Sequence, residues 1–75
     1  MDLEKPDDVL VMISSALEHH TDGKVYDGNC IGYLSWDGDD LLVPIVTMEQ
    51  AAEGNYSVRD NPVTVYRVKI ERVIP

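Results

Sequence analysis

The chain has 75 residues, with 44% hydrophobic and 27% charged side chains, one cysteine and a net charge of −8. This length predicts one domain, and the composition excludes a disordered chain, a disulfide scaffold and a membrane-spanning segment. A core this small rarely contributes more than about 3–5 kcal/mol of stability, so we expect very regular packing or a partner chain.

The environment of the protein is indicated by its cysteine and its first residues. Cys30 lies in an apolar run and is expected to be a buried free thiol in a reducing compartment. Residues 1–5 are acidic and lack the apolar segment of a signal peptide. The sequence therefore predicts a cytoplasmic protein without a membrane partner.

The negative charge is unevenly distributed. Residues 1–58 contain twelve Asp or Glu side chains and two Lys, a net charge of −10, whereas residues 59–75 have a net charge of +2. Phosphate contacts require cations, so this charge disfavours direct binding of nucleic acid. An acidic surface suits a basic protein partner, unless it serves only solubility.

Residues 6–20 have the pattern of an amphipathic helix. Pro6 suits the first helical position, and two aspartates follow it where the helix dipole favours carboxylates. Gly23 supplies a stop. Apolar residues recur at offsets of three and four, which predicts a stripe that packs on a sheet. The stripe comprises Val9, Leu10, Met12, Ile13, Ala16 and Leu17, and leaves Val11 outside.

Three segments in the middle of the chain are expected to be strands. Residues 24–26 form a short strand between two Asp-Gly turns. Residues 30–36 and 41–46 pair as a hairpin around the acidic turn 37–40. Because Pro44 cannot donate a backbone hydrogen bond, its strand is expected at a sheet edge or a bulge.

The second half of the chain predicts a short helix and a long strand. Thr47 and Gln50 have capping-box spacing, which predicts a helix over residues 48–53 that ends at Gly54. Residues 63–74 alternate with a period of two, and their even positions are expected to face the core. The odd positions carry Arg67, Lys69 and Glu71.

This order of elements predicts the α+β class. We expect an N-terminal helix packed on a small antiparallel sheet of three to four strands, with a short second helix before the last strand.

No set of residues meets the requirements of a catalytic or metal site. His19 and His20 are adjacent, so on a helix they point about 100° apart and cannot easily share one ion. The acidic loops that begin at Asp22 and Asp37 lack the ligand spacing of an EF-hand. No nucleophile elbow or phosphate-binding glycine loop occurs. We expect no enzyme activity and no metal or cofactor, and a pairing of Cys30 with a histidine is the remaining catalytic alternative.

The acidic turns and their aromatic neighbours are therefore the candidate binding residues. Trp36 directly precedes the acidic turn and is either a binding hot spot or the main ring of the core. We expect the acidic turns to gather at one end of the sheet, where their carboxylates would resemble a row of phosphates. The candidate partner-binding residues are Trp36, Asp37, Asp39, Asp40, Asp22, Asp27, Glu49 and Glu53.

Small size, acidity and the lack of a catalytic motif are typical of inhibitor proteins, including phage-encoded proteins of the anti-CRISPR kind. We expect a non-enzymatic inhibitor that occupies a basic, nucleic-acid-binding surface of a partner protein. The alternative is a structural or assembly module that forms a homodimer by strand pairing, through the last strand or the edge near Pro44.

Overall fold

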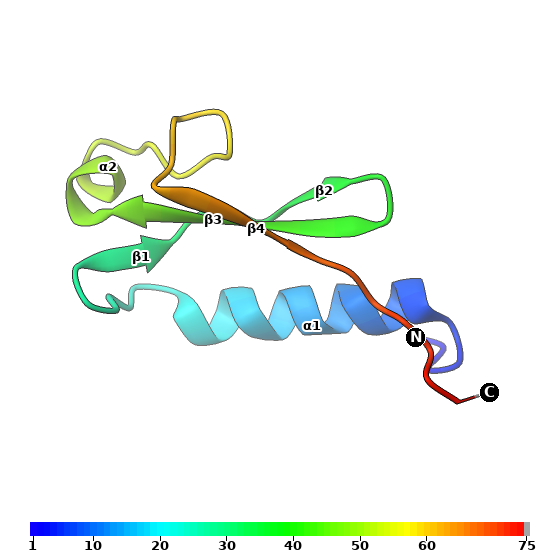
Figure 1. The fold of residues 1–75 in the computed structure, drawn as a ribbon. Helices are drawn as coiled ribbons and strands as arrows, with labels where there is room; N and C mark the ends of the chain where they lie inside the picture. The colour runs from blue at the N-terminus through cyan, green and yellow to red at the C-terminus, as the bar shows by residue number, and fades with distance from the viewer. Residues whose placement is uncertain (75) are drawn as a thin grey trace.

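The computed structural model describes residues 1–74. These residues form α1 (Pro6–Thr21), β1 (Asn29–Ile31), β2 (Ser35–Asp37), β3 (Asp40–Thr47), α2 (Met48–Ala52) and β4 (Thr64–Val68). All strand pairs are antiparallel, α1 lies across one face of the sheet, and α2 lies at one end of it (Figure 1). The predicted α+β architecture, with a second helix before the last strand, is confirmed.

The central strand of the sheet is β3. β1 and β2 pair one after the other along one edge of β3, and β4 pairs along the other edge. The prediction that Pro44 lies in an edge strand is therefore wrong. The Pro44 carbonyl accepts a hydrogen bond from the Gly32 N–H at 2.8 Å, so the position of its missing N–H faces the same side. On that side of β3, the segment between β1 and β2 is not paired as a strand. The missing N–H of Pro44 therefore leaves no backbone acceptor without its donor.

The strand predicted over residues 30–36 is interrupted at residues 32–34. There the Tyr33 N–H donates to the Tyr56 carbonyl at 2.9 Å, which draws the chain toward the loop after α2. Gly32 is required at this point because a Cβ atom would lie 2.2 Å from the Tyr56 carbonyl oxygen. The break between β1 and β2 therefore follows from a close approach of two backbone segments.

Two other predicted strands are shorter in the structure. The strand over residues 24–26 is reduced to one bridge between Tyr26 and Asn29. The strand over residues 63–74 is limited to β4. Beyond β4, Arg72 donates a hydrogen bond to the Glu4 carbonyl, so the chain follows the N-terminal segment instead of the sheet.

One stripe of α1 faces the sheet. Leu10 is only 1% exposed and Leu17 is half-buried, and Ser14 lies between them on the same side of the helix. Val11 lies outside this stripe, as predicted, and is exposed. Met12, Ile13 and Ala16 are also exposed, so the predicted stripe was too wide.

The core in the described part of the chain is aliphatic. Leu41 and Val43 of β3 pack against Leu10 on the α1 face of the sheet. Val46 is buried on the opposite face, where α2 contacts β3. Trp36 is 46% exposed, so the alternative that it forms the main ring of the core is wrong. Cys30 is half-buried and not the fully buried thiol that was expected.

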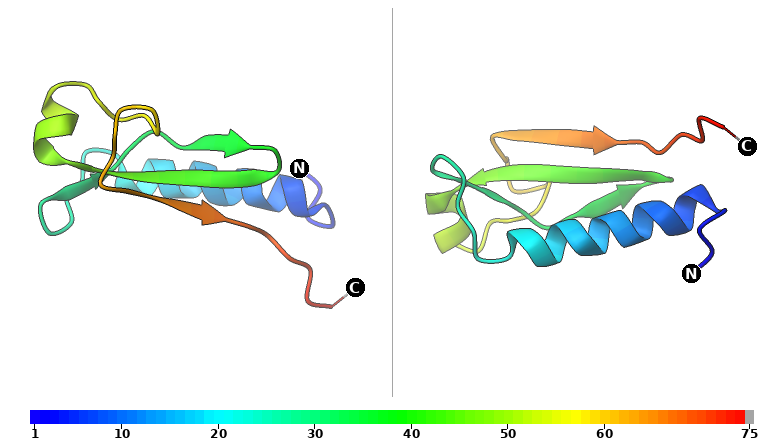
Figure 2. Two further views of the ribbon diagram at one scale, coloured as in Figure 1. Left: turned by 45° about the horizontal axis from the view of Figure 1, so that its top comes forward. Right: turned by 90° about the horizontal axis from the view of Figure 1, so that it is seen from below.

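α1 is displaced toward the β1 and β2 side of the sheet and leaves β4 uncovered (Figure 2). Residues 64–67 of β4 are accordingly exposed on both faces of the sheet. Among the even positions of the strand predicted over residues 63–74, Val68 and Ile70 pack against the core, whereas residues 64, 66, 72 and 74 are exposed.

The predicted capping box at the start of α2 is confirmed. The Thr47 hydroxyl accepts from the Gln50 N–H, and the Gln50 side-chain carbonyl accepts from the Thr47 N–H, each at 3.0 Å. The Gln50 amide also donates to the carbonyls of Asp60 at 3.2 Å and Asn61 at 2.8 Å. This one side chain therefore connects α2 to the loop that leads into β4.

Candidate functional site

The predicted acidic residues do not gather at one end of the sheet. The turn 37–40 lies where β3 begins, near the first turn of α1 (Figure 1). Asp22, Asp27 and the glutamates of α2 lie where α1 and β3 end. The eight residues of β3 separate the two groups by about 23 Å of extended chain. The single negative patch expected from the sequence is therefore absent in residues 1–74.

Two carboxylates of the turn are paired with cations of the last strand. Arg67 contacts Asp37 through Nη2 and Asp40 through Nη1, both at 2.7 Å, and the Lys69 ammonium lies 3.4 Å from Asp40. The hydrogen bond from Arg67, aided by Lys69, holds the pKa of Asp40 below its usual value. The same bonds, first that to Asp37, raise the pKa of Arg67. This cluster occupies the sheet face away from α1, because Arg67 lies opposite Leu42.

Trp36 and Asp39 lie on the α1 side of the same turn. Together with Asp7 and Val11 of the first turns of α1, they line a hollow of about 150 Å³. Neither carboxylate has an ion-pair partner within residues 1–74. The indole therefore shares this hollow with two available carboxylates.

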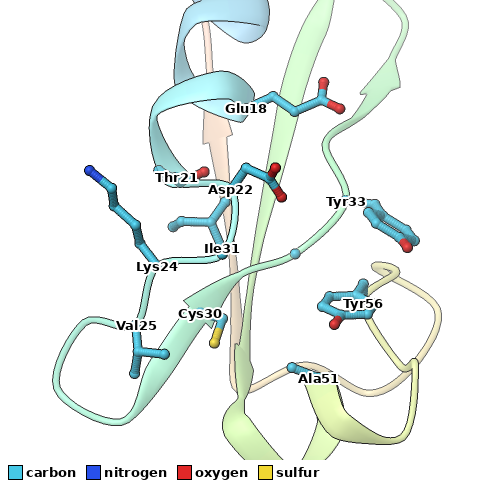
Figure 3. A pocket seen from close by; sticks show the side chains of 12 residues that line it. Glu18, Thr21, Asp22, Lys24, Val25, Cys30, Ile31, Tyr33, Ala51 and Tyr56 are labelled. Atoms are coloured by element: carbon cyan, nitrogen blue, oxygen red, sulfur yellow. The ribbon is translucent and has the colours of Figure 1, made fainter.

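A larger hollow, of about 340 Å³, lies between the end of α1, β1 and the loop after α2. On one side of it the carboxylates of Glu18 and Asp22 are directed toward the opening, and Tyr33 and Tyr56 lie on the other side (Figure 3). The two tyrosine rings stack, with centroids 4.8 Å apart and planes inclined by 28°. Lys24 points away from the opening (Figure 3), so its ammonium leaves the carboxylates available.

Both hollows open along the same side of α1. Asp7, Glu18 and Asp22 are spaced by eleven and four residues, which places them on one side of a helix. From Asp7 to Asp22 the helix rises by about 22 Å. We call this surface the acidic–aromatic side, and it comprises Asp7, Glu18, Asp22, Asp39, Tyr33, Trp36 and Tyr56.

Three of the predicted binding residues thus lie on the acidic–aromatic side, with Trp36 and Asp39 at one hollow and Asp22 at the other. The other five do not line either hollow: Asp37, Asp40, Asp27, Glu49 and Glu53. The residues of this side that were not predicted from the sequence are Asp7, Glu18, Tyr33 and Tyr56. The four-residue spacing of Glu18 and Asp22 could have identified those carboxylates, whereas the stacking of the tyrosines depends on a tertiary contact.

Within residues 1–74, no group of three or more His, Cys, Asp or Glu side chains is placed to hold a metal ion. Neither helix of the described chain has the length and apolar character needed to cross a membrane.

Comparison of the chain with protein-family models, with curated proteins and with solved structures found no match.

Proposed function

We propose that the protein is a non-enzymatic binding protein whose acidic–aromatic side engages a basic surface of a partner protein. The hollow between Glu18, Asp22 and the stacked tyrosines carries this proposal. A guanidinium or ammonium group in this hollow would meet carboxylates on one side and aromatic rings on the other. Both contacts favour a cation, and the rings favour arginine in particular.

The extent of the acidic–aromatic side suits a row of cations more than a single one. Its carboxylates run along about 22 Å of α1 and reach the Trp36 hollow at the far end. Rows of Arg and Lys side chains at this scale are typical of grooves that bind a nucleic-acid backbone. We therefore propose an inhibitor that occupies such a groove, and a phage-encoded anti-defence protein is one setting for that activity.

Solubility alone does not account for these features. A solubilising surface requires only dispersed charges, whereas here Trp36 and Tyr33 are large exposed aromatic side chains that lie beside carboxylates. Exposed aromatic rings are enriched at the centres of protein interfaces, where they contribute most of the binding energy. The net charge of −8 would also accelerate the encounter with a basic partner.

An arginine-rich peptide is a suitable probe, with binding measured by isothermal titration calorimetry. The double variant Glu18→Gln, Asp22→Asn is expected to weaken binding by about ten-fold, and the wild-type affinity should fall as salt rises. The control is Glu49→Gln, Glu53→Gln, which removes the same charge from two side chains that line neither hollow. Equal losses in the two double variants would mean that net charge alone attracts the peptide, and the proposal would be wrong.

A further inference from the structure

The outer edge of β4 has no strand partner within residues 1–74. Because the Pro44 backbone faces β1, its neighbours Val43 and Ile45 face β4. Their partners on β4 are Tyr66 and Thr64, which therefore use their backbone groups within the sheet. The intervening residues, Val65 and Arg67, direct their N–H and C=O groups outward.

We propose that two copies of this chain associate by antiparallel pairing of β4 with the same strand of the second copy, about a two-fold axis at Tyr66. In this register Val65 of one copy lies opposite Arg67 of the other, and their outward N–H and C=O groups form reciprocal hydrogen bonds. The two Tyr66 residues face each other as a non-hydrogen-bonded pair. The dimer contains one continuous sheet with both α1 helices on the same face.

The side chains around the axis are apolar and exposed in the single chain. Tyr66 is 60% exposed on the α1 face of the sheet, and Val65 is 39% exposed on the other face. Viewed down the axis of α1, Glu18 is rotated about 80° from Leu10 in one direction. Ile13 is rotated about 60° from Leu10 in the opposite direction. Ile13, which is 46% exposed, therefore lies on the margin toward β4. Both faces of the paired strands would gain apolar contacts from the second copy.

Charge favours a second copy over a basic partner at this edge. Cations on an edge strand normally discourage strand pairing, but here Arg67 and Lys69 are already paired with Asp37 and Asp40. The edge is thus close to neutral, whereas the acidic side of α1 is the surface that attracts cations. A register centred on Tyr66 also keeps Arg67 opposite Val65 and not opposite its own copy, so like charges do not meet.

The area that a stable dimer requires exceeds what the paired strands alone can bury. A standard interface removes about 800 Å² from each partner, and the single chain exposes 5603 Å². Five residues of paired strand cannot reach that area alone, so the exposed margin of α1 has to take part. The core of a chain this size contributes only about 3–5 kcal/mol, and closing the apolar edge of β4 would add to it.

Sedimentation equilibrium of the full chain tests the proposal. The wild type is expected to be a dimer whose dissociation constant stays the same or decreases between about 50 and about 500 mM NaCl, because salt screens the repulsion between two acidic chains. Tyr66→Glu places two carboxylates at the axis and should weaken the dimer by about ten-fold or more. The control is Tyr26→Glu, at a tyrosine that is 44% exposed in the loop before β1. A monomeric wild type, or equal behaviour of the two variants, would overturn the proposal.

A cysteine pair tests the register independently of affinity. In a Cys30→Ser background, Tyr66→Cys should form an intermolecular disulfide with oxidised glutathione, because Cα atoms of a non-hydrogen-bonded pair are about 4.5 Å apart, within disulfide range. Arg67→Cys and Tyr26→Cys in the same background should remain largely reduced. If Arg67→Cys were oxidised faster than Tyr66→Cys, the axis would not lie at Tyr66 and the proposed pairing would be wrong.

Discussion

Arg67 and Asp37 are 30 positions apart in the sequence, yet the Arg67 Nη2 donates a hydrogen bond to Asp37 Oδ2 at 2.7 Å. The Nη1 of the same guanidinium donates to Asp40 Oδ2 at 2.7 Å. Asp37 ends β2, Asp40 begins β3, and Arg67 belongs to β4. One side chain therefore connects three strands at the end of the sheet where the hairpin turns, on the face that α1 does not cover.

The first prediction concerns pH. The pKa of Asp40 in the folded chain lies below the ordinary value of 3.8, to which it returns on unfolding. The unfolded chain therefore binds the proton first as the pH falls. The stabilisation from Asp40 is complete above about pH 5 and is lost as the pH falls through 3.8 toward the folded-state pKa. Urea unfolding at about pH 6 and about pH 3 should show a smaller loss of stability for Asp40→Asn than for the wild type.

Asp39→Asn is the matched control for this experiment. Asp39 is the neighbouring residue in the same turn, and it has no ion pair within the described residues. Its substitution should reproduce the wild-type difference between the two pH values. If Asp40→Asn lost as much stability on acidification as Asp39→Asn, the bond to Arg67 would have no part in the acid sensitivity.

Local patterns were sufficient to predict most of the elements of this fold. The capping box at Thr47 and Gln50 and the placement of Pro6 correspond closely to the starts of the two helices. Periodicity did not determine how far α1 covers the sheet. Ile13 and Leu10 have equivalent positions in the apolar pattern, but α1 is displaced from β4, so only Leu10 is buried. That displacement depends on tertiary packing, which has no local signal.

The candidate site was less accessible to sequence reasoning than the fold. Acidic residues in turns were identified from composition, but their partners come from distant segments. Arg67 neutralises Asp37 and Asp40 across the sheet, whereas Tyr56 reaches Tyr33 from the loop after α2. Both relationships depend on the order of strands, which a single sequence does not reveal. The available carboxylates of the acidic–aromatic side are consequently Asp7, Glu18 and Asp22 along α1 and at its end, with Asp39 alone from the hairpin turn.

A second prediction tests the orientation of α1. Leu10→Ala should reduce the free energy of unfolding by about 2–5 kcal/mol, because it leaves a cavity in the core. Ile13→Ala removes a similar side chain from an exposed position and should cost less than about 1 kcal/mol. Both should be measured in the Tyr66→Glu variant, so that self-association does not contribute. Similar losses for the two substitutions would show that α1 is rotated relative to the structure described.

A third prediction concerns the close approach of Gly32 and Tyr56. In Gly32→Ala, the new Cβ would lie 2.2 Å from the Tyr56 carbonyl oxygen and 3.0 Å from Cγ of Pro44. The backbone at residue 32 or at Tyr56 must therefore move, which should reduce the free energy of unfolding by about 1–3 kcal/mol. The same movement should disturb the tyrosine stack. The near-ultraviolet circular dichroism of the tyrosines would report this disturbance. The control is Gly38→Ala, because no atom lies near a Cβ at this position, where φ is 61°. It should reduce the free energy of unfolding by about 1–2 kcal/mol through backbone strain and leave the tyrosine signal unchanged.

The last prediction concerns the connection that Gln50 makes between α2 and the loop before β4. Asn61 adopts a φ of 55°, which is unfavourable for a residue with a side chain, and its carbonyl accepts from the Gln50 amide. Gln50→Ala removes both this bond and the bond to Asp60, and should reduce the free energy of unfolding by about 1–3 kcal/mol.

Hydrogen exchange distinguishes a local from a global effect of Gln50→Ala. Amide protons in residues 56–61 should exchange faster than in the wild type, because the loop loses its attachment to α2. Glu49→Ala, one position earlier on the exposed surface of α2, should leave these rates unchanged. Protection that fell equally in both variants would mean that the loop is held by the helix as a whole. In that case the Gln50 amide would not determine how the chain enters β4.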